Sequence, residues 1–165
     1  MPSALPIDLM GQTLWNRSTD FDTAAQEHFC ALYGADAGWV RHYLEEISDL
    51  CDTDYTNANG PRLRPDLAPR YERIAALSRA AAEHKMMPSP AAERLQATIE
   101  QNILHAEALA ALAAGDEARA AERFRAYCSL IRSSETRFQP DLDVYRVIEV
   151  SEKFTGLREH LPFQA

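Results

Sequence analysis

The stretch SPAAERLQATIEQNILHAEALAALAAGDEARAAERFRAYCSLIRSSETRF, residues 89–138, decides the fold of this chain. Ser89 followed by Pro90 is a strong helix start, because the hydroxyl caps the first turn and proline fits the first helical position. Apolar positions then recur at spacings of three and four, as in a helix packed nearly antiparallel on a neighbour. A Gly-Asp pair at 115–116 is typical of a tight turn. We therefore predict a long helical hairpin of Pro90–Ala114 and Glu117–Phe138.

Helical spacing continues on both sides of this hairpin. Phe21 is expected on the buried face of the first additional helix, and Asp36 and Asp66 are expected to cap the second and third. Residues 52–65 predict a loop, because Asp, Thr, Asn, Gly and two prolines dominate them. The additional helices are predicted at Phe21–Tyr33, Ala37–Cys51, Leu67–Lys85 and Asp141–Phe154.

The two ends of the chain carry weaker signals. Residues 1–18 hold many apolar side chains without a dominant period, so we expect an irregular arm with at most a short helix near Ile7–Leu14. Residues 156–165 contain a glycine and a proline and predict a tail. The expected organisation is an arm over 1–18, a helical bundle domain over 19–155 and this tail. The expected fold class is all-α, an antiparallel bundle of five or six helices.

Composition excludes several classes of protein. The chain has 165 residues, which suits one domain, and 46% of them are hydrophobic, enough for a core. Its 27 alanines against four valines and seven isoleucines favour helix over sheet. The net charge of -8 disfavours binding to nucleic acid through a broad basic face. No apolar run is long enough to span a bilayer, and residues 1–9 do not resemble a signal peptide, so we expect a cytoplasmic protein without a membrane partner.

The residues that could carry chemistry do not form a convergent set. The three cysteines make no Cys-x-x-Cys pair, and no two of the five histidines stand three or four apart, so we expect no metal and no cofactor. An acidic group follows one helix face and its exit loop, which predicts a solvated surface and not a catalytic carboxylate pair. A group of arginines could form a local basic patch that grips a carboxylate or a partner. These two groups are Glu45, Glu46, Asp49, Asp52 and Asp54, and Arg41, Arg62, Arg64, Arg70 and Arg73.

One segment carries a family resemblance. Leu14-Trp15-Asn16, followed by His28-Phe29-Cys30, Leu32-Tyr33-Gly34 and Arg41-His42-Tyr43-Leu44, resembles the region after the barrel in bacterial glycoside-hydrolase-like proteins of domain-of-unknown-function family 4838. The likeness covers about residues 9–47. It implies a helical domain that follows a (β/α)₈ barrel, and in such proteins the catalytic carboxylates lie on the barrel. The resemblance therefore implies no catalysis by these residues, in a fragment or a stand-alone relative.

Three functions remain open at this point. The first is a non-catalytic accessory domain of a carbohydrate-active enzyme, which buttresses a barrel or mediates association. The second is a free-standing helical interaction module, and the third is a small enzyme or a ligand-binding regulator domain. We expect the apolar arm either to fold back near Phe29 and Tyr33 or to bury itself in a second copy of the chain. The residues expected at such an interface are Leu9, Leu14, Trp15 and Trp39.

Overall fold

The computed structural model describes residues 5–51, 64–138 and 142–159, and these residues form α-helices with one 3₁₀ turn. No β-strand occurs in these three ranges, so the predicted all-α class is confirmed. The elements are α1 Leu5–Trp15, α2 Phe21–Tyr33, η1 Gly34–Asp36, α3 Ala37–Leu50, α4 Ala68–Ala82, α5 Pro90–Ala114, α6 Glu117–Phe138 and α7 Val144–Thr155.

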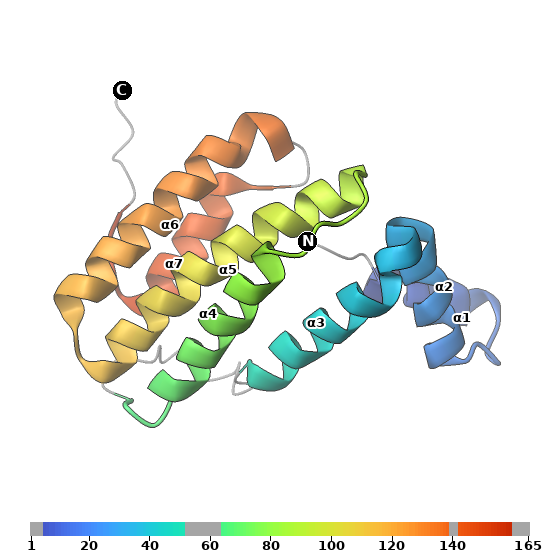
Figure 1. The fold of residues 1–165 in the computed structure, drawn as a ribbon, viewed down its shortest axis with the longest axis horizontal. Helices are drawn as coiled ribbons and strands as arrows, with labels where there is room; N and C mark the ends of the chain where they lie inside the picture. Colours follow the sequence, from blue (N-terminus) through green and yellow to red (C-terminus); the bar gives the residue numbers. More distant parts are fainter. Residues whose placement is uncertain (1–4, 52–63, 139–141, 160–165) are drawn as a thin grey trace.

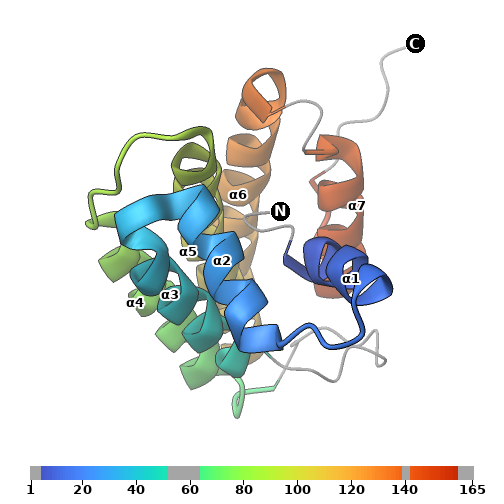
Figure 2. The ribbon, with the colours of Figure 1, turned by 90° about the vertical axis from the view of Figure 1, so that its right-hand side faces the viewer.

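Helix α5 is the centre of the bundle. It packs along α4 on one side and along α6 on the other, and α7 lies against α6 (Figure 1). Helix α3 lies beside α4, and α1 and α2 occupy one end of the molecule, nearest the viewer in Figure 2. Among the described helices, α1 makes its main contacts with α2.

The α5–α6 hairpin forms for the reasons that the sequence predicts. The Ser89 hydroxyl oxygen accepts the Ala92 N–H at 3.0 Å, which caps α5. Gly115 ends α5 with a φ of +82°, a left-handed conformation that glycine adopts without a steric penalty. Small side chains let the two helices approach closely near this turn. Ala108, Leu112 and Ala120 are fully buried there.

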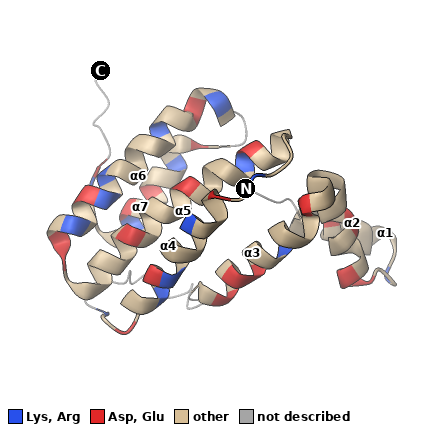
Figure 3. Cartoon of the chain, in the orientation of Figure 1, with Lys and Arg blue, Asp and Glu red and all other residues tan. Residues whose placement is uncertain are grey.

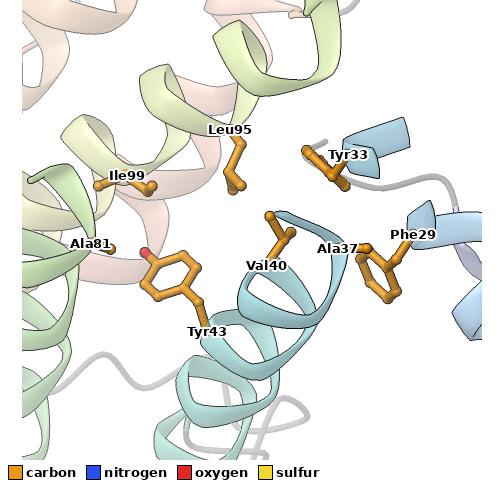
Figure 4. Close-up of a cluster of buried hydrophobic side chains, with 8 residues drawn as sticks. All are labelled: Phe29, Tyr33, Ala37, Val40, Tyr43, Ala81, Leu95 and Ile99. Atoms are coloured by element: carbon orange, nitrogen blue, oxygen red, sulfur yellow. The ribbon is translucent and has the colours of Figure 1, made fainter. Parts of the chain in front are cut away.

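The core joins both halves of the chain. One cluster combines residues of α2 and α3 with residues of α4 and α5, as the close-up in Figure 4 shows. Its polar edge is satisfied, because the Tyr43 hydroxyl lies 3.1 Å from the Ser78 hydroxyl and accepts the Asn102 side-chain amide at 3.3 Å. The cluster consists of Phe29, Tyr33, Ala37, Val40, Tyr43, Ala81, Leu95 and Ile99.

Several local predictions need correction. The arm is more regular than expected, because Leu5–Trp15 form a helix that includes the short one predicted at 7–14. Phe21 lies on the same face of α2 as Ala25 and Phe29 but is exposed, because it is the first residue of the helix and burial on that face begins one turn later, at Ala25. The Asp66 carboxylate accepts from Arg64 and does not cap α4.

Asp36 also departs from its predicted role as a helix cap. Its carboxylate accepts the Met87 N–H at 2.9 Å and lies 3.0 Å from His84 Nε2, and it does not bond to the first turn of α3. We call this arrangement the Asp36 clasp. It fastens the start of α3 to the segment that connects α4 with α5. The Met87 N–H and then His84 hold the pKa of Asp36 below its ordinary value.

Candidate docking surface

Helix α1 touches the rest of the protein along one side only. Leu5 packs against the cluster that contains Phe29 and Tyr33, which is the fold-back contact expected for the arm. The Asp8 carboxylate lies 2.9 Å from His28 Nδ1 on α2 and also accepts from Gln12 at 3.3 Å. These contacts fix the inner side of α1 but bury none of its residues completely.

The outer side of α1 exposes large apolar side chains. Ile7 is 73% exposed, Met10 64%, Leu14 82% and Trp15 94%. Their spacing of three, four and one residues places them on one side of a helix. We call these four residues the α1 face. Phe21, which is 59% exposed at the start of α2, follows close behind in the sequence. A monomer seldom concentrates its exposed apolar residues in this way.

A shallow groove of about 540 Å³ opens at Gly11, along one edge of the α1 face. Ile7 and Trp15 border it one helical turn before and after the glycine. Its polar rim comes from the inner side of α1 and from the turn that follows. The lining residues are Ile7, Asp8, Gly11, Gln12, Trp15, Asn16 and Thr19.

The turn after α1 holds Trp15 on an ordered backbone. The Asn16 N–H bonds to the Gln12 carbonyl at 2.7 Å, and the Thr19 hydroxyl donates to the Asn16 carbonyl at 2.7 Å. The Asn16 side-chain oxygen accepts the Ser18 N–H at 3.0 Å. Asp20 then caps α2 through the Thr23 N–H. The exposed indole is therefore presented from a hydrogen-bonded turn.

The structure brings together only part of the interface predicted from sequence. Leu14 and Trp15 belong to the α1 face, whereas Leu9 is half-buried on the side of α1 toward the protein. Trp39 lies on α3, where its ring stacks on His84 at 3.9 Å between centroids and on Tyr43 at 5.9 Å. Ile7 and Met10 belong to the apolar arm for which we expect a contact, but they are not among the four residues predicted at the interface. Their spacing to Leu14 was the signal that could have found them.

The described histidines each have a place in the fold. His28 pairs with Asp8, His84 belongs to the Asp36 clasp, and His42 lies 3.4 Å from Glu46 along α3. The His105 ring stacks on Tyr127 at 4.7 Å, and its buried Nε2 has no hydrogen-bond partner among the described residues. Desolvation lowers the pKa of His105 to about 4. His160 lies outside the described residues.

Several of the charged residues considered as sites are engaged in ion pairs. Arg41 lies 2.7 Å from Asp22 and 2.8 Å from Glu45, and Arg64 pairs with Asp66, so two members of the expected basic patch are neutralised. Asp52, Asp54 and Arg62 lie outside the described residues. Figure 3 shows Lys and Arg interleaved with Asp and Glu along the helices. No group of three or more His, Cys, Asp or Glu in the described ranges could hold a metal ion.

Buried ionisable groups serve the packing of the helices. Glu107 on α5 pairs with Arg79 of α4 and lies 3.4 Å from Arg123 of α6, so one carboxylate bridges three helices. Burial raises the pKa of the Cys128 thiol to about 11, which keeps it protonated near neutral pH. Glu152 accepts the Glu159 N–H at 2.5 Å and thereby ties residue 159 to α7.

A larger groove of about 810 Å³ lies between α6 and α7. Its charged walls are internally paired, because Glu149 contacts both Arg146 and Lys153 at 2.6 Å. Lys153 and Arg146 lower the pKa of Glu149 accordingly. Arg132 donates to the Glu159 carbonyl. The groove therefore carries mixed charge and offers no single electrostatic preference for a ligand.

Comparisons with protein-family models, curated proteins and solved structures find no match to this chain. None of the described helices is long and apolar enough to cross a membrane.

Proposed function

We propose that this chain is a non-catalytic helical domain that works by association with another protein through the α1 face. The observation that carries the proposal is the concentration of Ile7, Met10, Leu14 and Trp15 on one uncovered side of α1. An apolar face of this kind costs solubility if nothing covers it, so its position on an ordered helix favours a binding role. The α1 face is more apolar than the mixed-charge groove between α6 and α7, and it is the better docking surface.

The roles of the buried ionisable groups support a non-catalytic function. Glu107 bridges α4 and α6, Glu152 holds the backbone at residue 159, and the Cys128 thiol stays protonated. The His105 ring stacks on Tyr127 with its Nε2 buried and its pKa lowered to about 4, so it is a neutral packing residue at pH 7. A general acid or base must reach a substrate, whereas Glu107 and His105 face neighbouring helices and Glu152, at the groove between α6 and α7, is engaged by the Glu159 N–H.

The resemblance of residues 9–47 gives this proposal a more specific form. In the resembling proteins the Leu-Trp-Asn segment follows a barrel. A barrel domain is therefore one partner on which the α1 face would pack. In that form the domain is an accessory part of a bacterial carbohydrate-active enzyme, and carbohydrate contacts the parent enzyme. A cytoplasmic location also belongs to the proposal. The alternative is a free-standing interaction module, which uses the same face.

Site-specific photo-crosslinking tests the docking role. A photoreactive phenylalanine analogue at position 14 should give a protein adduct in cells, mapped by mass spectrometry to the α1 face. The same analogue at position 87 is the control, because Met87 is 69% exposed and lies outside α1. Equal adduct yields at both positions would contradict the proposal. Turnover of aryl-glycosides by the purified chain, abolished by one carboxylate substitution, would contradict its non-catalytic part.

A further inference from the structure

We propose that the protein that covers the α1 face is a second copy of this chain, with α1 packed on α1 about a twofold axis. This inference rests on the proposed function and names its partner. Four observations carry it: the charge of the surface, the glycine at its groove, the arrangement of its side chains, and the area it offers.

The charge distribution favours a copy of the same neutral surface. Residues 5–16 contain one ionisable side chain, Asp8, which contacts His28 on the inner side of the helix. The whole chain carries a net charge of -8, so two copies repel each other over most of their surfaces. Contact through Ile7, Met10, Leu14 and Trp15 joins uncharged side chains, and the one carboxylate that lines the groove, Asp8, lies 2.9 Å from His28 Nδ1 of its own copy. A nucleic acid or an anionic membrane would instead meet an acidic protein.

Gly11 is not required by the chain's own packing. A methyl group at this position would meet no atom within 4 Å, and its φ is not left-handed. Alanine would therefore fit and would stabilise the helix, because glycine lowers helix stability. Small residues at such positions let a second helix approach closely. A glycine at this position leaves room for a neighbouring helix to lie against the groove at its Cα atom.

The α1 face is self-complementary in shape. Ile7, Gly11 and Trp15 form one row along the helix at intervals of four residues, with the gap at the glycine. Met10 and Leu14 form the neighbouring row. In an antiparallel pair, a side chain of the second row of one copy enters the gap of the other, and the twofold axis repeats the contact.

The area is suited to a weak and concentration-dependent dimer. The exposed parts of the four side chains amount to on the order of 500 Å² per copy, dominated by the tryptophan. Stable interfaces of standard size bury about 800 Å² per partner, so this contact lies at the weak end. We expect association as the protein concentration rises through the micromolar range.

Sedimentation velocity of the full chain, from about 1 μM to about 200 μM, tests the dimer. The weight-average mass should rise from 18.5 kDa toward twice that value. Met10→Gln should raise the dissociation constant at least about tenfold, which corresponds to the loss of one well-packed apolar contact. Met87→Gln is the matched control, because the same residue type is 69% exposed there against 64% at Met10. It should leave the dimer unchanged.

Gly11→Ala separates packing between copies from stability within one copy. This variant should melt at the same or a higher temperature than the wild type when dilute, yet it should dimerise several-fold more weakly. Unchanged far-ultraviolet circular dichroism would confirm that each variant is folded. A dimer that Met10→Gln and Gly11→Ala leave intact would overturn the assignment to α1.

The remaining outcomes distinguish this inference from the proposed function. A wild type that stays monomeric, with an adduct at position 14 to a different protein, overturns the second copy and leaves the docking role standing. A monomer with no adduct overturns both. Binding to phosphatidylcholine vesicles that Met10→Gln abolishes would assign the α1 face to a membrane surface and overturn the dimer.

Discussion

His105 should make the protein less stable in mild acid. Its pKa is 6.5 in an ordinary environment and about 4 in the fold, because burial against Tyr127 disfavours the charged ring. The unfolded chain therefore binds a proton more readily than the folded one. Stability is fully present above pH 6.5, falls as the pH drops below it, and levels off near pH 4.

The size of this effect follows from the two pKa values. Proton linkage converts the difference into about 3 kcal/mol over the whole range, and into about 2 kcal/mol between pH 7.5 and pH 5. His105→Phe keeps an aromatic ring against Tyr127 and removes the titration together with the buried Nε2. This variant should match or exceed the wild type in stability at pH 7.5, because a buried nitrogen without a partner is unfavourable.

Urea titrations followed by circular dichroism at both pH values provide the measurement. The loss of unfolding free energy between pH 7.5 and pH 5 should be about 2 kcal/mol smaller for His105→Phe than for the wild type. His42→Gln is the control, since His42 lies on an exposed surface beside Glu46, and its pH dependence should follow the wild type. An equal loss in His105→Phe and in the wild type would refute the reasoning.

Three further outcomes follow from named contacts. In Trp39→Phe the remaining Trp15 should emit at long wavelength and be fully accessible to a soluble quencher when dilute. In Trp15→Phe the remaining Trp39, which stacks on His84 and Tyr43, should emit at shorter wavelength and be quenched less. Identical spectra of the two variants would contradict both placements. Glu107→Gln removes the carboxylate between Arg79 and Arg123 and should lower the free energy of unfolding. The loss should be only about 1 kcal/mol, because both arginines are partly exposed to solvent. High salt should reduce the difference between the variant and the wild type. Phe124→Ala opens a cavity in a fully buried site and should cost about 3 to 5 kcal/mol in urea titrations; a cost under about 1 kcal/mol would show that the site collapses freely.

The sequence predicted those elements whose signals are local. Ser89 with Pro90 and the glycine at 115 mark the ends of α5, because each acts through the backbone of its own turn. Asp36 shows where local reasoning stops. An aspartate before a helix normally caps it, yet this carboxylate bonds to the backbone of Met87, a partner that only the tertiary fold brings near.

The candidate surface was predictable only in part, because exposure of a side chain also depends on the tertiary fold. Leu14 and Trp15 stand out in a segment with no helical period of its own, and the structure exposes both. Trp39 carries the same aromatic signal but stacks on His84, which approaches from the end of α4. The sequence does not distinguish an exposed tryptophan, such as Trp15, from one that stacks on a ring far away in the sequence, such as Trp39. Both are large apolar residues on helices that are partly exposed.

The Asp36 clasp has a consequence for chain continuity. The clasp holds residues 5–51 against residues 64–138 by non-covalent contacts. The core cluster around Val40 and Leu95 and the hydrogen bond from Asn102 to Tyr43 add to it. We expect a chain cut between residues 51 and 64 to keep these contacts, so two separately expressed fragments should reassemble in trans. Such fragments would serve as a complementation pair: if each is fused to one of two other proteins, their reassembly would indicate that those two proteins lie close together.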